Sequence, residues 1–227
     1  MEINPVAHIY TDFPTKFGIP RQSGLVEELK GRIVFEPYYR NTEAVKCLEE
    51  FNYIWLLWDF SMAHRKDWSA TVKPPRLGGK THIGVWATRS PHRPNSIGLS
   101  SVKLDRIEMT EEGPVLYVSG IDMADGTPVY DIKPYIPYCD VHSDAAGGFT
   151  EKEWTRLEVV IPDELLPLVP EGRLQALIKT LEEDPRPRYD AESDGKRKYG
   201  FYFCEKDVRF TVTGNVLTVV EIVPKDS

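Results

Sequence analysis

The sequence predicts a mainly β protein, in which a single-sheet β-barrel domain is followed by a small α+β domain. Short segments of alternating apolar and polar residues recur through the first 140 residues, and prolines and glycines separate them closely. Beyond residue 150, one segment has its apolar residues at helical spacing, and three strand-like segments follow it. We therefore expect a barrel over residues 1–140, a linker over 141–150 and a second domain over 151–227.

The first half is expected to hold one helix among its strands. Residues 42–51 carry apolar side chains at helical spacing, and Asn41 or Thr42 is suited to cap the N-terminus. Clear alternation or a short β-type run marks the strands. They are predicted over residues 81–88, around residues 102–104 and over residues 115–118.

The tail contains a helix and a hairpin. Residues 141–150 are small, polar and rich in glycine, as is typical of a linker. A stripe of leucine and isoleucine side chains predicts a helix over 172–183, and Gly214-Asn215 is a turn signal. The strands expected around them cover residues 157–161, 199–204, 208–213 and 216–223.

The composition is that of an ordinary soluble protein. Of the 227 residues, 41% are hydrophobic and 28% are charged, and the longest apolar run, over 53–58, is far too short to span a membrane. No signal peptide is visible, and the three cysteines are too few and too far apart for a disulfide framework or a metal cluster. We expect a cytoplasmic protein with no metal and no membrane association.

Charge is segregated along the chain. The formal net charge is −7, which by itself disfavours nucleic acid as a partner. However, residues 64–93 hold seven Lys or Arg and one acid, a local net charge of +6, so the remainder carries −13. A basic patch on an acidic body favours an anionic ligand that docks in one orientation, although a solvated basic loop would have the same composition.

The standard cofactor and nucleophile motifs are missing. The sequence has no Rossmann glycine fingerprint, no P-loop, no metal-ligand spacing and no G-x-S-x-G elbow. Instead, arginine and asparagine stand beside rigid prolines and glycines in five strings, which gives preorganised donors close to an accessible backbone. The strings are PRQ at 20–22, PPRLGG at 74–79, GVWATRSPHRPNSIGLS at 84–100, DGTPVYDIKPY at 125–135 and DPRPRY at 184–189.

These strings, in this order, closely resemble the TrmO family, also called TsaA-like or YaeB-like proteins, over nearly the whole chain. The resemblance implies a β-barrel that binds S-adenosylmethionine and works as a homodimer. It also implies N6-methylation of N6-threonylcarbamoyladenosine, beside the anticodon of threonine tRNA. At one place, Ser61-Met62, many relatives carry His-Gln, so we expect mainly backbone contacts there. The cofactor contacts implied by the motifs are Pro20, Arg21, Gln22, Ser61, Met62, Arg89, Leu99, Asp125, Gly126, Thr127 and Pro128.

The acceptor nitrogen of such a substrate is urea-like and weakly nucleophilic, so a base or a donor to the carbamoyl oxygen would help. Asp131 is the candidate base, and Lys133, Arg93 and Asn95 are candidate donors, while an Asp and a Lys two residues apart on a strand also pair commonly with neighbours. The residues expected to contact tRNA are Arg65, Lys66, Lys73, Arg76, Lys80, Arg186, Arg188 and Tyr189.

Two other functions remain open. A small-molecule methyltransferase would need the cofactor motifs without the basic patch. A non-catalytic RNA-binding adaptor would need the patch without the cofactor motifs.

Overall fold

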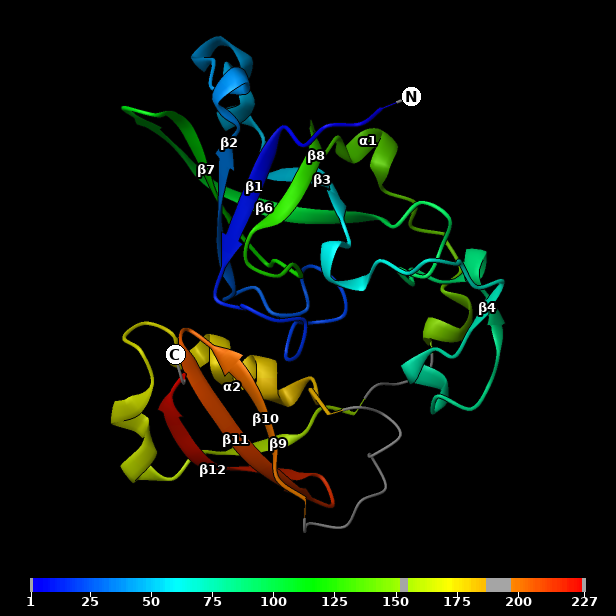
Figure 1. Cartoon of the computed structure of the whole chain (residues 1–227), viewed down its shortest axis with the longest axis vertical. Helices are drawn as coiled ribbons and strands as arrows, with labels where there is room; N and C mark the ends of the chain where they lie inside the picture. The colour runs from blue at the N-terminus through cyan, green and yellow to red at the C-terminus, as the bar shows by residue number, and fades with distance from the viewer. Residues whose placement is uncertain (1, 152–154, 187–196, 226–227) are drawn as a thin grey trace.

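The first two thirds of the chain form a closed antiparallel barrel (Figure 1). The computed structural model describes residues 2–151, 155–186 and 197–225. The strands follow one another around the barrel in the order β1-β2-β7-β6-β3-β8, and β8 pairs with β1 to close it. Their bounds are β1 Ala7–Thr11, β2 Lys30–Phe35, β3 Tyr53–Asp59, β6 Ile97–Thr110, β7 Gly113–Ser119 and β8 Thr127–Pro134.

Alternation along the strands fills the barrel. On β3, for example, Ile54, Leu56 and Trp58 point inward and are buried, whereas the residues between them are more exposed. The same pattern on β6 buries Val102 and Leu104. The barrel interior is therefore a packed apolar core, and functional side chains must come from the outer face or from the connections.

An arm leaves the barrel between β3 and β6 (Figure 1). Its two short strands, β4 Thr71–Val72 and β5 Ile83–Gly84, pair with each other and with no strand of the barrel. The arm contains most of the basic window at 64–93. Its other elements are short 3₁₀ helices at Ser61–Ala63, Pro75–Leu77 and Val85–Ala87.

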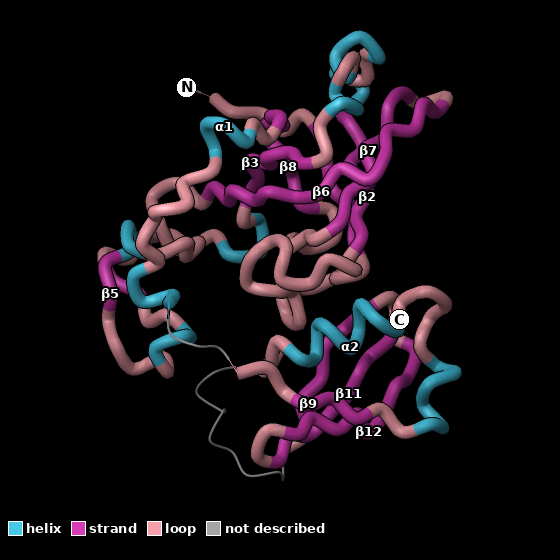
Figure 2. The backbone as a smooth tube through the Cα atoms, turned by 180° about the vertical axis from the view of Figure 1, so that it is seen from behind, coloured by secondary structure: helices cyan, strands magenta, loops and turns pink. Residues whose placement is uncertain are grey.

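The C-terminal part is a four-stranded sheet with one helix packed on it (Figure 2). The strand order is β10-β11-β12-β9, and β9 runs parallel to β12. Helix α2, Leu174–Glu182, buries Ala176, Leu177 and Leu181 against the sheet. The strands are β9 Glu158–Val160, β10 Tyr199–Phe203, β11 Lys206–Thr213 and β12 Val216–Pro224.

Along the chain, α1, Pro137–Asp140, and a 3₁₀ helix at Gly148–Glu151 come between β8 and β9. Three further 3₁₀ helices, at Pro37–Tyr39, Thr42–Val45 and Leu48–Glu50, follow β2, and another at Asp163–Leu168 follows β9. Among the described residues, every helix is too short or too polar to cross a bilayer.

The two parts share one continuous core. Phe13, in the loop after β1, has its ring centroid 5.5 Å from that of Phe203 on β10. Asp12 forms an ion pair of 3.1 Å with Arg173 at the start of α2 and accepts a backbone hydrogen bond from Cys204. The predicted fold class, a barrel followed by a small α+β unit, is confirmed.

Two predicted elements are wrong. Residues 42–51 form two 3₁₀ turns rather than one helix, because Cys47 between them has a left-handed backbone with φ of 64°. The predicted cap does form, since the Asn41 side chain accepts a hydrogen bond from the Glu43 N–H at 3.0 Å. Residues 81–88 contribute only the two-residue β5, because the chain turns into a 3₁₀ helix at Val85.

Candidate functional site

Four of the five segments expected to bind the cofactor meet around Asp122, a partly buried residue in the connection between β7 and β8. Its Oδ1 accepts a hydrogen bond of 2.7 Å from Ser100 Oγ, and its carboxyl also accepts the Ser23 backbone N–H. Ser100 follows Leu99, Ser23 follows Gln22, and Asp125 lies three residues further along the same connection. The fourth segment contributes the charge of Arg89, which acts on the same carboxyl.

A buried donor supports this junction from the barrel interior. Trp58 Nε1 donates to Ser100 Oγ at 3.0 Å, so tryptophan, serine and aspartate form a chain of hydrogen bonds. The indole lies directly against Gly98, where an added Cβ would be 2.2 Å from a ring atom. Burial raises the pKa of Asp122 from 3.8 to about 6, against the opposing effects of Ser100, Ser23 and Arg89.

The 20–22 segment is fixed at both ends. Pro20 is buried, and the Arg89 guanidinium donates to the side-chain oxygen of Gln22. Arg21 is exposed and donates across to the backbone oxygen of Asp184, at 3.5 Å. One predicted cofactor segment therefore contacts both the arm and the C-terminal part.

The 125–128 segment presents acceptors. The N–H groups of Asp125, Gly126 and Thr127 all donate within the protein, to Phe13, Ile9 and Ala124. The Asp125 carboxylate accepts from the Thr11 N–H at 2.9 Å. A ligand at this loop would therefore meet carbonyl and carboxylate oxygens, which suit the amino edge of an adenine or an ammonium group.

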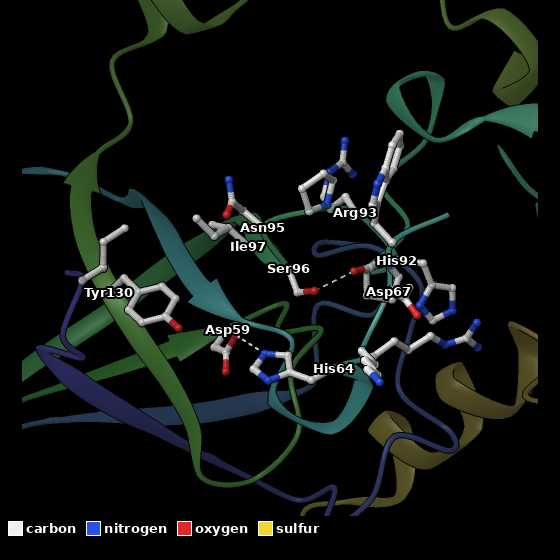
Figure 3. Close-up of a pocket in the computed structure, with 15 residues that line it drawn as sticks. Asp59, His64, Asp67, His92, Arg93, Asn95, Ser96, Ile97 and Tyr130 are labelled. Carbon is white, nitrogen blue, oxygen red and sulfur yellow. Dashed lines mark hydrogen bonds and ion pairs between the residues drawn. The ribbon is translucent and has the colours of Figure 1, made fainter. Parts of the chain in front are cut away.

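A pocket of about 640 Å³ opens on the outer face of β3, β6 and β8 (Figure 3). Its lining residues are adjacent in sequence to two of the predicted cofactor segments. Ser61 and Met62 lie between two of its lining residues, Asp59 and His64, and Ile97 shares the outer face of β6 with Leu99. The lining residues are Ile3, Asp59, His64, Arg65, Lys66, Asp67, Trp68, Pro91, His92, Arg93, Pro94, Asn95, Ser96, Ile97 and Tyr130.

Asp59, His64 and Tyr130 form a polar group on one wall of the pocket (Figure 3). His64 Nε2 lies 2.7 Å from Asp59 Oδ1. A bulge in the pairing of β3 with β8, which sets Leu57 opposite Asp131 and Trp58 opposite Val129, leaves Tyr130 as the extra residue. Burial and the neighbouring Asp59 raise the pKa of the Tyr130 phenol. None of the three was identified from the sequence, because only the strand register brings them together.

The other wall is cationic. Arg65, Lys66 and Arg93 line it together with His92, whose pKa is lowered by burial and then by Arg65 and Lys16. The imidazole of His92 is therefore neutral at physiological pH.

The candidate catalytic residues fall into two groups. Arg93 and Asn95 line the pocket. Asp131 and Lys133 instead pair with each other on β8 at 2.8 Å, and both remain partly exposed. Leu57 of β3 is opposite Asp131 on one side and Leu99 on the other, so these three side chains share the outer face of the barrel.

The residues expected to contact tRNA are not one surface. Arg65 and Lys66 lie at the pocket, whereas Lys73, Arg76 and Lys80 lie on the arm. The Arg76 guanidinium donates to the backbone oxygen of Thr150, which ties the arm to the segment before β9.

Of the C-terminal candidates, the structure describes only Arg186. Arg186 is only 7% exposed, and its guanidinium is held by both oxygens of Asp184, at 2.8 and 3.0 Å. This ion pair stabilises the local fold, and a contact of Arg186 with tRNA stays a prediction. Arg188 and Tyr189 lie outside the described residues.

Comparison with known proteins gives matches over both parts of the chain. Residues 8–141 match the family model described as the tRNA-methyltransferase O N-terminal domain, and residues 157–225 match the TrmO C-terminal domain. The chain is 33% identical to the tRNA (adenine(37)-N6)-methyltransferase of Escherichia coli, over 99% of this chain and 98% of that protein. It is 34% identical to a Pyrococcus abyssi protein named as a probable S-adenosyl-L-methionine-binding protein, over 68% of this chain and 78% of that one. A crystal structure of TrmO from Pseudomonas aeruginosa superposes with a TM-score of 0.77, at 30% identity and 98% coverage of both chains.

Proposed function

Because the chain belongs to the TrmO family of tRNA methyltransferases, we propose that it methylates N6 of N6-threonylcarbamoyladenosine beside the anticodon of threonine tRNA. The coarser activity, transfer of a methyl group from S-adenosylmethionine to N6 of a tRNA adenine, is that of the family. The observation that supports the proposal is the junction at Asp122, where four predicted cofactor segments, or residues adjacent to them in sequence, come together.

The donor groups of the junction fit S-adenosylmethionine. The oxygens of the 125–128 loop suit its adenine amino group or its ammonium group, and Arg89 suits its carboxylate. Pro20, Gln22 and Leu99 would complete the site, with Arg21, Ser61, Met62 and Pro128 at its edges. When bound, the cofactor supplies an electrophilic methyl group on a sulfonium.

The protein's contribution to the reaction is chiefly positioning. The target nitrogen carries a proton and is conjugated to a carbamoyl group, so it is a poor nucleophile. We assign Arg93 and Asn95 to donate hydrogen bonds to the carbamoyl oxygen, because both line the pocket. Asp131 is kept as the proposed proton acceptor, with Lys133 holding its carboxylate in place, since it shares the outer barrel face with Leu99.

The basic window is proposed to hold the tRNA. Arg65 and Lys66 would meet phosphates at the pocket, and Lys73, Arg76 and Lys80 would meet them along the arm. We also propose a cytoplasmic homodimer.

The decisive experiment is mass spectrometry of tRNA nucleosides after incubation with isotopically labelled cofactor. We expect label in N6-methyl-N6-threonylcarbamoyladenosine, and none when the tRNA lacks the threonylcarbamoyl group. Label in a methylated adenosine that has no threonylcarbamoyl group would overturn the substrate assignment. Label only in small molecules, or none despite tRNA binding, would favour the two alternative functions, a small-molecule methyltransferase or an RNA-binding adaptor.

The cofactor assignment has its own test. Arg89→Ala removes both the contact with Gln22 and the charge beside Asp122, so we expect S-adenosylmethionine binding to weaken at least tenfold in calorimetry. Arg32→Ala, an arginine on β2 that is outside the junction, is the matched control. Near-wild-type affinity of the Arg89 variant would contradict the assignment.

A further inference from the structure

Two exposed tryptophans stand together on the arm. The Trp68 and Trp86 rings stack with centroids 6.0 Å apart and planes inclined by 26°, and the side chains are 51% and 67% exposed. Neither contributes to the barrel core. Large apolar side chains exposed as a pair on a soluble protein usually mark a contact surface.

The backbone around the pair is fixed. Thr71 pairs with Gly84, and the Val85 N–H donates to the Ala70 oxygen at 3.0 Å. The Ser69 N–H donates to the oxygen of His92 at 3.1 Å, which holds Trp68 against the segment that forms the cationic wall. The rings are therefore presented by a short hairpin that the structure anchors on both sides.

Arg93 adds a third layer. Its guanidinium carbon lies 5.5 Å from the centroid of the Trp86 ring. Nη1 donates to the backbone oxygens of Thr88 and Ser90, both at 3.1 Å, so the orientation of the guanidinium is fixed before any ligand binds. Aromatic rings and arginine planes are the surfaces on which unpaired bases stack.

The layers adjoin a space of suitable size and charge. Trp68 and Arg93 both line the 640 Å³ pocket, which lies within the range of small-ligand sites and has room for one nucleotide. Arg65 and Lys66 line the same pocket and would meet a phosphate. His92 also lines this pocket, although its Nδ1 atom is buried and has no hydrogen-bond partner among the described residues.

We propose that Trp68 and Trp86, with Arg93 packed against Trp86, form a stacking platform for the target nucleotide of the tRNA after it leaves its own stack, with its phosphate at Arg65 and Lys66. The inference rests on the proposed function, since it requires tRNA as the substrate. The pocket places this nucleotide beside the cofactor segments, because Met62 and Leu99 flank its lining residues.

The test is tRNA binding by Trp68→Ala and Trp86→Ala in the full chain. Stacking of a base contributes enough that each variant should bind tRNA about 5- to 100-fold more weakly. Because no charge is removed, the dependence of affinity on salt should keep its wild-type slope, whereas neutralising Arg65 and Lys66 should reduce the slope. Trp68→Phe should recover most of the affinity for tRNA. All three tryptophan variants should bind S-adenosylmethionine as the wild type does.

Tyr38→Ala is the matched control, because Tyr38 is an aromatic residue that is 89% exposed and lies outside the pocket. If the tryptophan variants bind and methylate tRNA as well as this control does, the platform is wrong while the proposed function stands. If the wild-type chain binds no tRNA, the proposed function fails, and the platform with it.

Discussion

At the scale of single residues, Asp122 connects several segments of the chain but lowers the stability of the folded protein when it is ionised. Its carboxyl group connects segments that lie between residues 23 and 125, through Ser23, Ser100 and the charge of Arg89. Burial raises its pKa to about 6, so at neutral pH the folded protein carries an ionised group that is poorly solvated. Polar strain of this kind is common at functional sites, where it is offset by the rest of the fold.

This gives a prediction with a definite sign. The folded state binds the Asp122 proton more tightly than the unfolded state, so its contribution to stability is full below pH 4 and is lost as pH rises to about 6. The Asp122→Asn variant does not lose stability in this way, because its side chain does not ionise. We expect the variant to gain about 2–3 kcal/mol relative to the wild type between pH 4 and pH 7.5, in the free energy of unfolding by urea.

The same variant should bind S-adenosylmethionine more weakly, because the neutral amide no longer attracts Arg89. Asp144→Asn, at an exposed carboxyl in the segment that connects β8 to β9, is the control for the pH comparison. A stability difference between the Asp122 variant and the wild type that is equal at both pH values would contradict the assignment of the pKa.

At the scale of elements, different residues of the arm provide its exposed charge and its attachment to the rest of the protein. Arg76 donates a hydrogen bond to the backbone oxygen of Thr150, so its removal would also loosen the arm. Lys73 and Lys80 are exposed and lie on either side of Arg76 in the sequence. Neutralising the two lysines together should lower the slope of log affinity for tRNA against log salt by about 1–2. Cofactor affinity should stay the same. A full slope in the double variant would mean that the arm is a solvated face.

The elements also show what the sequence could predict. The strands of the tail, its hairpin and α2 were correct, because alternation and helical spacing there coincide with packing on one sheet. Residues 81–88 alternate just as well, yet most of them have no partner strand, and alternation without a partner does not make a sheet. The helix predicted over residues 42–51 does not form for a local reason. The backbone at Cys47 is left-handed, and the sequence carries no signal for it.

The candidate site was predictable only through its motifs. Resemblance predicted the cofactor segments, but their meeting point, Asp122, and the polar group of Asp59, His64 and Tyr130 depend on barrel register. Periodicity identifies residues that face the core, and these residues lie on the outer face or in connections. For the pocket, the sequence carries one signal outside the motifs. Trp68 and Trp86 lie inside the basic window, an unusual place for large aromatic side chains.

At the scale of the whole molecule, the barrel and the C-terminal sheet depend on each other. Gly18 has φ of +84°, and an added Cβ would lie 2.2 Å from the Phe201 ring on β10. We expect Gly18→Ala to lower the stability by about 2–4 kcal/mol, measured by thermal unfolding, because it adds a clash to a strained backbone.

Gly24 supplies the matched control. Its φ is +78°, so an alanine there is under similar backbone strain, but no atom lies within 4 Å of the added Cβ. The excess effect of Gly18→Ala over Gly24→Ala therefore measures the contact between the two parts. Equal effects would show that the contact with Phe201 contributes nothing.

Closure of the barrel by β1 and β8 has a consequence for the order of events during synthesis. Ala7 pairs with Val129, so β1 remains without one neighbour during synthesis until more than a hundred further residues have been made. The predicted cofactor segments are spread over the same interval, from Pro20 to Pro128, and no partial barrel contains them all. Contacts of such long sequence separation form slowly. Cofactor added during translation should therefore protect only chains that have passed β8, and shorter nascent chains should be equally sensitive to protease with and without it.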